Sequence, residues 1–218
     1  MKKTIYSRFP KENIADLPTV SFEGRIVVVL SEREAEKAVD FLLTQAFLGI
    51  DTETRPSFRR GQLHMVSLLQ VSTNDICFLF RLNRTDLTPA IVRLLEDERV
   101  AKVGLSLHDD ILSLKRRKLF VPGHFIDLQS MVGELGIEDM SLQKLYANLF
   151  GQKISKRQQL TNWDADVLNE RQKRYAATDA WACLQMYHEI CRLKATNDYE
   201  QIKPPPPPMP PNPLRGEP

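Results

Sequence analysis

Few cysteines, no long apolar run and almost no net charge limit what this 218-residue chain can be. Its three cysteines, Cys77, Cys183 and Cys191, lie in apolar runs without a Cys-x-x-Cys or Cys/His metal-ligand spacing, and their number is odd. Reduced, buried thiols fit this pattern, so we expect a cytoplasmic protein. No segment reaches the ~20 apolar residues of a membrane-spanning helix, and the charged start MKKTIYSRFPKEN lacks the apolar region of a secretion signal. We therefore expect neither secretion nor membrane insertion.

The balance of charge removes any general argument for nucleic-acid binding. Thirty Lys and Arg residues stand against 28 Asp and Glu residues, which leaves a formal net charge of +2. A nucleic-acid interface would have to be a local feature of the surface. Hydrophobic residues make up 42% of the chain, which is enough to bury a core, and the length suits one globular domain.

The composition divides the chain into three parts. Residues 1–22 carry scattered prolines without sustained periodicity, so we expect an arm that is laid over the domain or left mobile. Residues 23–195 form the domain, and residues 196–218 form a proline-rich tail. The prolines after residue 203 favour an extended polyproline II conformation, which suits docking to a protein partner with an aromatic groove. Such a role would be compatible with catalysis in the domain.

Within the domain, strand patterns come early and helix patterns come late, which indicates an α/β fold. The turn-prone residues 72–75 separate two apolar runs and predict a hairpin. Ser31 and Glu34 form a capping-box pattern at the start of a helix. We expect strands at 25–30, 47–51, 65–71, 76–80 and 100–105, and helices at 31–45, 88–95, 107–119, 128–135, 142–150 and 169–193.

Two acidic residues follow the apolar run FLGI. Asp51 and Glu53 are two residues apart at a strand end, so the alternation of a β-strand sends both side chains to one side. Carboxylate oxygens are the ligands that Mg²⁺ prefers, and a pair of them can begin a metal site. Taken alone, the pair would more often mark a solvated strand end.

Two further groups supply acidic residues at helical positions. Asp109 and Asp110 lie early in the helix expected at 107–119, where an aspartate can also cap a helix. Tyr175 and Asp179 are four residues apart in a long helix, so their side chains share one face. Each of these groups alone is also typical of surface or half-buried helix residues.

Taken together and in this order, GIDTET, KVGLSLHDD and RQKRYAATDAWACLQMY resemble the DEDD superfamily of 3′-5′ exonucleases in its tyrosine-bearing branch. The exonuclease domain of the Werner syndrome protein and its stand-alone bacterial relatives are similar, and ribonuclease D is more distantly so. The resemblance runs from about residue 22 to residue 192. It implies a ribonuclease H-like fold with a mixed central sheet flanked by helices.

The resemblance also implies the chemistry of the site. Asp51, Glu53, Asp110, Tyr175 and Asp179 occupy the catalytic positions, and the four carboxylates would hold two divalent metal ions, Mg²⁺ or Mn²⁺. The implied reaction releases 5′-nucleoside monophosphates from the 3′ end of a nucleic acid strand, with the phenol orienting the attacking water. Asp110 is preferred to its neighbour because the family's aspartate directly precedes the apolar helix positions.

Basic and aromatic residues near the motifs are candidates for holding the strand, because the overall charge is too small to attract it. DNA is favoured over RNA by the resemblance to the Werner-type domain, while ribonuclease D-like trimming of RNA and a non-cleaving binding module are the alternatives. The candidate strand-binding residues are Arg55, Phe58, Arg59, Arg60, Lys153, Lys156 and Arg157.

Overall fold

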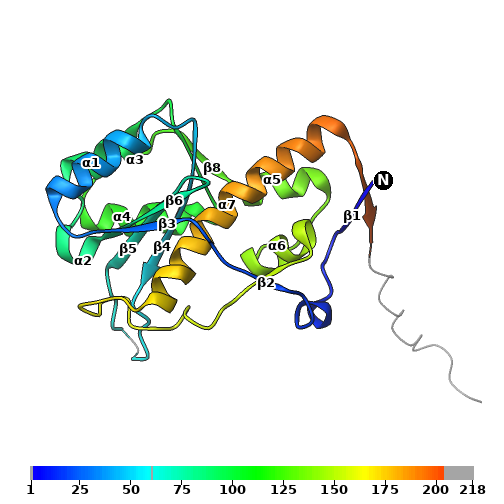
Figure 1. The fold of residues 1–218 in the computed structure, drawn as a ribbon, viewed down its shortest axis with the longest axis horizontal. Helices are drawn as coiled ribbons and strands as arrows, with labels where there is room; N and C mark the ends of the chain where they lie inside the picture. Colours follow the sequence, from blue (N-terminus) through cyan, green and yellow to red (C-terminus); the bar gives the residue numbers. More distant parts are fainter. Residues whose placement is uncertain (1, 60, 204–218) are drawn as a thin grey trace, which may run out of the picture.

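The computed structural model describes residues 2–59 and 61–203 of the chain (Figure 1). Arg60 and the segment 204–218 lie outside the described residues. The predicted contact of Arg60 with nucleic acid therefore falls outside them, as do the conformation and the partner predicted for the prolines.

A mixed six-stranded sheet forms the centre of the molecule (Figure 1). Its strands are β3 (Arg25–Val29), β4 (Phe47–Thr54), β5 (Val66–Ser72), β6 (Ile76–Arg81), β7 (Ala101–Gly104) and β8 (Phe125–Asp127). They stand in the order β3-β6-β5-β4-β7-β8. The pairs β4/β5 and β5/β6 are antiparallel, and the other three pairs are parallel. The predicted hairpin is therefore confirmed as β5 and β6.

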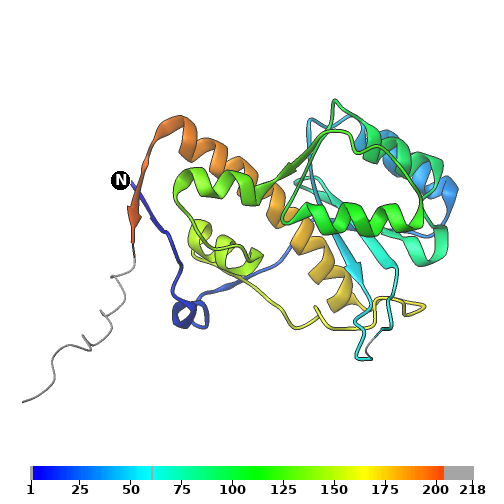
Figure 2. The ribbon, with the colours of Figure 1, turned by 180° about the vertical axis from the view of Figure 1, so that it is seen from behind.

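Helices cover both faces of this sheet. They are α1 (Glu32–Leu42), α2 (Leu82–Thr85), α3 (Pro89–Glu96), α4 (Leu107–Arg117), α5 (Leu128–Val132), α6 (Leu142–Phe150) and α7 (Glu170–Thr196). The buried residues of α1, α3 and α4 share one hydrophobic cluster with the sheet, whereas α7 packs on the opposite face and continues beside α5 and α6 (Figures 1 and 2). The predicted architecture, a mixed central sheet flanked by helices, is confirmed.

Three of the predicted helices are shorter than their sequence pattern, and one of them, expected at 31–45, ends at Leu42. The helix expected at 128–135 ends at Val132 and gives way to a 3₁₀ turn, Gly133–Leu135, which Gly136 closes in a left-handed conformation with φ of 74°. The helix expected at 107–119 ends at Arg117, since Lys118 is already extended. The other helices begin and end within a few residues of the prediction, and the predicted capping box of Ser31 and Glu34 is present.

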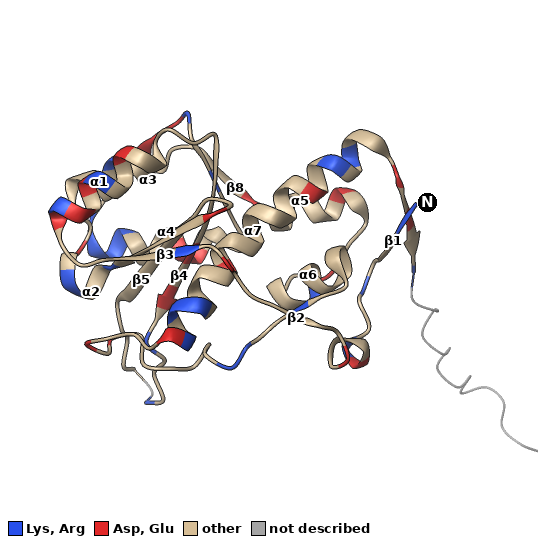
Figure 3. Ribbon diagram, viewed as in Figure 1, with Lys and Arg blue, Asp and Glu red and all other residues tan. Residues whose placement is uncertain are grey.

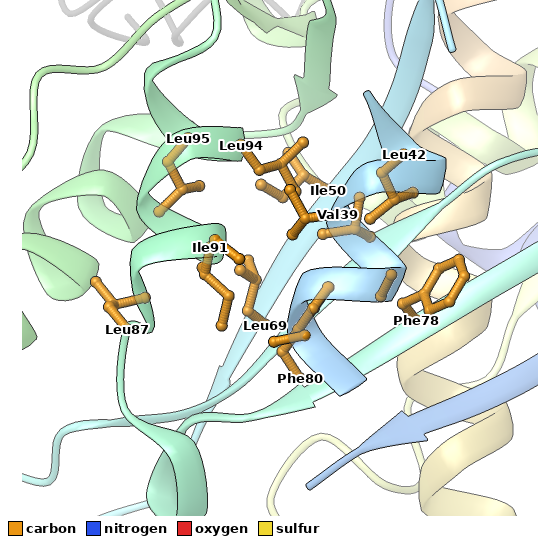
Figure 4. Packing of buried hydrophobic residues seen from close by; sticks show 14 of the residues in the cluster. Val39, Leu42, Ile50, Leu69, Phe78, Phe80, Leu87, Ile91, Leu94 and Leu95 are labelled. Atoms are coloured by element: carbon orange, nitrogen blue, oxygen red, sulfur yellow. The ribbon is translucent and has the colours of Figure 1, made fainter. Parts of the chain in front are cut away.

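The core on the α1 and α3 face fixes which side chains of β4 point the other way. Ile50 of β4 packs with Val39 of α1, Leu69 of β5 and Ile91 of α3, and each of these is at most 2% exposed (Figure 4). Burying a side chain of this size contributes roughly 1.5–3 kcal/mol. Because the side chain of Ile50 is buried in this core, the side chains of the residues directly before and after it in β4 point to the opposite face of the sheet, where α7 lies.

A single glycine lets α7 approach that face closely. A Cβ atom at Gly49 would lie 1.9 Å from the carbonyl oxygen of Ala180 and 2.9 Å from its carbonyl carbon. Any side chain at this position would therefore force the helix backbone away from β4. The glycine in turn brings Asp179, the residue before Ala180, close to the acidic end of the strand.

Both ends of the described chain form short strands outside the main sheet. β1 (Lys3–Tyr6) pairs in parallel with β10 (Tyr199–Ile202), and β2 (Thr19–Val20) pairs in parallel with β9 (Lys153–Ile154). Ile5 is fully buried in the cluster formed by α5, α6 and α7. The described part of the N-terminal arm is thus laid over the domain, and residues 199–202, placed in the tail by composition, form a strand.

All three cysteines lie within the described residues. Cys77, Cys183 and Cys191 are all free thiols, and the first two are buried. Within the described ranges, no helix is both long enough and apolar enough to cross a membrane. Lys and Arg residues are interspersed with Asp and Glu over much of the ribbon, in keeping with the small net charge (Figure 3).

Candidate active site

The C-terminal half of β4 carries the first two acidic residues. Asp51 and Glu53 project to the α7 face of the sheet and are half-buried. The pairing of β4 with β5 shifts register between Glu53 and Thr54, so the regular ladder ends directly after the second carboxylate. Such irregularities re-aim side chains and are frequent next to active sites. The same-side placement predicted from strand alternation is what the structure has.

Helix α7 carries the next two residues. Its first turn is fixed by a capping box in which Asn169 and Gln172 bond each other's backbone N–H groups. Tyr175 and Asp179 follow one helical turn apart on the face that meets β4. Asp179 is only 4% exposed, and Tyr175 packs against the indole of Trp163 with ring centroids 6.0 Å apart.

Three carboxylates converge where β4 meets α7. One oxygen each from Asp51, Glu53 and Asp179 lies within 4.8 Å of the other two. The Oδ1 atom of Asp179 is buried and has no hydrogen-bond partner within residues 2–59 and 61–203. A buried carboxylate oxygen without a donor, close to two further carboxylates, suits a hard divalent cation, which would supply the missing interaction. The residues present therefore fit a divalent metal.

Asp110 lies beside this group of three rather than in it. It belongs to the first turn of α4, and its Oδ1 accepts a hydrogen bond from the hydroxyl of Thr52, the middle residue of the first motif. The start of α4 is held in turn by Asp127, whose carboxylate accepts the N–H groups of Ser106 and Leu107 at 3.0 and 2.9 Å. Asp109 is exposed on the helix surface.

Burial and mutual repulsion disfavour the charged form of these acids. Burial, followed by the charge of Asp51, raises the pKa of Glu53 to about 10. Burial raises the pKa of Asp179 to about 7 against the opposing effects of the Tyr175 hydroxyl and the Lys156 ammonium, and it raises the pKa of Asp110 to about 6. The pKa of Asp51 is raised for the same reason, by burial and then by Asp179 and Asp110. A bound cation would reverse this balance.

An Asp179→Asn variant should therefore be more stable than the wild type when no metal is bound. The raised pKa means that folded Asp179 keeps a proton which the unfolded chain releases, so this residue lowers stability as pH rises from about 4 to about 7. With chelator at pH 8 we expect the variant to melt about 5 °C higher, which corresponds to 1–2 kcal/mol in a chain of this size.

Thermal melts at pH 5 and pH 8, with chelator and with Mn²⁺, measure this effect. The difference should shrink at pH 5, and Mn²⁺ should raise the melting temperature of the wild type more than that of the variant. Equal melting temperatures of the two proteins in chelator at pH 8 would contradict the repulsion.

A cavity of about 320 Å³ opens over the carboxylates. Lys156 lines this cavity together with Tyr175, and its positive charge favours the ionised form of Asp179. A cation at this place can meet a phosphate group that approaches the acids. The other lining residues are Thr52, Leu105, Ser141, Leu142, Gln143, Ile154, Ser155, Gln159 and Cys183.

The other predicted strand-binding residues lie outside this cavity. Arg55, Phe58 and Arg59 line a separate hollow in the loop after β4, where Phe58 is 84% exposed. The ammonium of Lys153 donates to the carbonyl oxygen of Ala15 and ties β9 to the arm. Arg157 lines a neighbouring cavity of about 360 Å³, which shares Tyr175 with the first.

The sequence did not single out Thr52. Its hydroxyl donates a hydrogen bond from β4 to Asp110 in α4. The only sequence feature that could have indicated this role is the position of a hydroxyl residue between two acidic residues at a strand end. Ser155 and Gln159, which surround Lys156 in the cavity wall, gave no signal because they lie in an irregular segment between β9 and α7.

The sequence of this chain matches a family of nucleases. A family model described as 3′-5′ exonuclease matches residues 26–193. A 3′-5′ exonuclease of Arabidopsis thaliana is 28% identical over 202 residues, covering 84% of this chain and 70% of the relative. The bifunctional 3′-5′ exonuclease/ATP-dependent helicase WRN of Mus musculus is 27% identical over 191 residues, covering 83% of this chain but only 14% of the relative.

A solved structure supports the fold. The Aedes aegypti Nibbler EXO domain superposes with a TM-score of 0.75 at 21% identity and covers 84% of this chain and 95% of that domain. The expected ribonuclease H-like fold is confirmed by this match, and the family resemblance found in the three motifs is confirmed by the family model.

Proposed function

Since this chain belongs to the 3′-5′ exonuclease family, we propose that it hydrolyses the phosphodiester bond at the 3′ end of a nucleic acid strand and releases 5′-nucleoside monophosphates. The observation that supports this most directly is the convergence of Asp51, Glu53 and Asp179 within 4.8 Å in one cavity. A phenol and an ammonium group line the same cavity, so acids, a hydrogen-bond donor and a cation all face one volume.

The carboxylates would serve as metal ligands. Asp51, Glu53 and Asp179 would hold divalent ions directly, and Asp110 would take part through its place beside them. Two bound Mg²⁺ or Mn²⁺ ions would lower the pKa of a water and stabilise charge on the departing 3′ oxygen. The raised pKa of Glu53 and of Asp179 supports this assignment, because acids held so close together need a cation to ionise at neutral pH.

Tyr175 would orient the attacking water rather than remove its proton. Burial, followed by the charges of Asp179 and Glu53, raises the pKa of the phenol above its ordinary value of 10. The hydroxyl therefore stays protonated at neutral pH and can act as a donor or acceptor toward a water but not as a base.

A Tyr175→Phe variant tests this role. It keeps the ring packed against Trp163 and removes only the hydroxyl. We expect kcat to fall about 10²-fold with KM nearly unchanged, in line with the loss of one oriented hydrogen bond to the reacting group. Single-turnover cleavage of a labelled strand measures the step. A large rise in KM without a change in kcat would assign the hydroxyl to substrate binding instead.

Local charges would hold the strand. Lys156, which lines the cavity, would meet the phosphate next to the bond that is cut, and Arg55, Phe58 and Arg59 would offer cations and an exposed ring in the loop after β4. Because the net charge is only +2 and few cations would meet phosphates, this binding should be weak and should depend only modestly on salt. Arg157 and Lys153 would contribute at most from the edge of this surface.

DNA is the proposed substrate, with ribonuclease D-like trimming of RNA as the alternative. Matched DNA and RNA oligonucleotides of one sequence, labelled at the 5′ end and digested with Mg²⁺ or Mn²⁺, decide between them. A ladder that shortens from the 3′ end faster for DNA supports the proposal, and faster loss of RNA favours the alternative. If the wild type cuts neither strand, the chain is a non-cleaving binding module and the enzymatic proposal fails.

A further inference from the structure

Gln70 is a fully buried polar side chain in the central sheet. It lies in the middle of β5 with 0% of its surface exposed, between Leu68 in the same strand and Leu79 opposite it in β6, which are also fully buried. Neither Nε2 nor Oε1 of its amide has a hydrogen-bond partner among residues 2–59 and 61–203. A buried amide without partners lowers stability, and an apolar residue of the same size would avoid that cost. Stability alone does not account for glutamine at this position.

The register of the sheet places Gln70 directly opposite Asp51. Directly paired residues of antiparallel strands project to the same face, with Cβ atoms about 4.5–5.5 Å apart. The carboxamide therefore lies on the face where α7 brings Asp179 to Asp51. A glutamine side chain is long enough to bring its amide N–H groups to the neighbouring carboxylate, by a rotamer change or through one water.

The chemistry of the amide suits this neighbour. Asp51 already lies close to Glu53 and Asp179, so another acid would add to the repulsion. A neutral amide can donate a hydrogen bond to a carboxylate without bringing a charge that competes with a metal ion. Carboxylates that bind metals are commonly held in orientation by such neighbouring donors, and loss of the donor typically weakens metal affinity or activity 10–100-fold.

We propose that Gln70 is a positioning residue for Asp51. When a divalent cation binds, its amide turns to donate toward the Asp51 carboxylate, a contact that the metal-free structure does not make, and holds that carboxylate in the orientation that binds the cation. This inference rests on the proposed function only in assuming that Asp51 is a metal ligand, and it does not require that the bound strand be DNA or that any strand be cut.

Three variants separate positioning from packing. Gln70→Met removes the amide but keeps nearly the same volume, and Gln70→Asn keeps an amide on a shorter side chain. Leu79→Met changes packing at the paired position on the same buried face and serves as the control. Mn²⁺ binding is measured by titration calorimetry without nucleic acid, thermal melts are recorded in chelator, and kcat and KM are measured on a labelled strand.

We expect Gln70→Met to bind Mn²⁺ about 10-fold more weakly and to lower kcat about 10-fold, with a melting temperature in chelator equal to or above that of the wild type. Gln70→Asn should recover part of the affinity, and Leu79→Met should leave it unchanged. Unchanged Mn²⁺ affinity in Gln70→Met would overturn the proposal, as would an equal loss in the control. A wild type that binds Mn²⁺ but cuts no strand would sink the proposed function and leave this inference standing.

Discussion

An Asp51→Asn variant should lose about 10⁴-fold in exonuclease activity, because removal of a metal-binding charge withdraws several kcal/mol of transition-state stabilisation and each 1.36 kcal/mol is tenfold in rate. Asp51 lies at the centre of the group, since its charge raises the pKa of Glu53 and its own pKa responds to both Asp179 and Asp110. Asparagine has nearly the same shape, so the loss would report on charge rather than on packing.

The rate of release of the 3′-terminal nucleotide measures this loss, with Asp16→Asn as a matched control. Asp16 is exposed in the N-terminal arm and makes no ion pair within residues 2–59 and 61–203. The control should keep wild-type activity, and the melting temperature of Asp51→Asn in chelator should not fall. Activity within tenfold of the wild type in Asp51→Asn would remove Asp51 from the catalytic group and with it the main support for the proposed function.

Substitution of the two adjacent aspartates at the start of α4 should have very different effects on exonuclease activity. Asp110→Asn should lower activity about 10³-fold, because it removes a half-buried charge next to the other acids, a loss of about 4 kcal/mol in barrier terms. Asp109→Asn should change activity less than twofold, since its side chain is exposed. The two variants differ by one position in the same helical turn, so effects on the helix terminus are closely matched.

Initial rates of Asp110→Asn measured over a range of Mn²⁺ concentrations test whether its loss of activity comes from weaker metal binding. If Asp110 helps to hold a metal ion, the difference in rate between this variant and the wild type should become smaller as the Mn²⁺ concentration rises. The reverse pattern, with Asp109→Asn inactive and Asp110→Asn active, would show that the second motif is offset by one residue. A Thr52→Val variant gives a useful comparison, because it removes the hydroxyl that binds Asp110 and leaves both carboxylates of β4 in place.

The parts of the site that local periodicity determines could be predicted from sequence. The two-residue period of a strand places Asp51 and Glu53 on one side, and the helical period places Tyr175 and Asp179 on one face, as the structure has them. Neither pattern predicts that the pair on the strand and the pair on the helix lie close together. Their proximity depends on the close approach of α7 to β4, which a lone glycine at position 49 permits and which sequence periodicity does not reveal.

Features that depend on long-range contacts were not predictable. β2 and β9 are each two residues long and are separated by more than a hundred residues in the sequence, so no alternating pattern predicts them. The burial that raises the pKa of Glu53 and Asp179 likewise follows from tertiary packing rather than from the motif. Among the basic residues, only the fold separates Lys156, which lines the cavity, from Lys153, which binds the arm.

The pairing of β2 with β9 joins the N-terminal arm to the segment that leads into the cavity wall. β9 leads directly into Ser155 and Lys156 of the cavity wall, and its only strand partner among the described residues is β2 of the arm. A fragment trimmed to the span of the family model, residues 26–193, would keep every carboxylate but would leave that wall without its neighbour. The span matched by the family model therefore leaves out a strand that pairs beside the wall of the cavity.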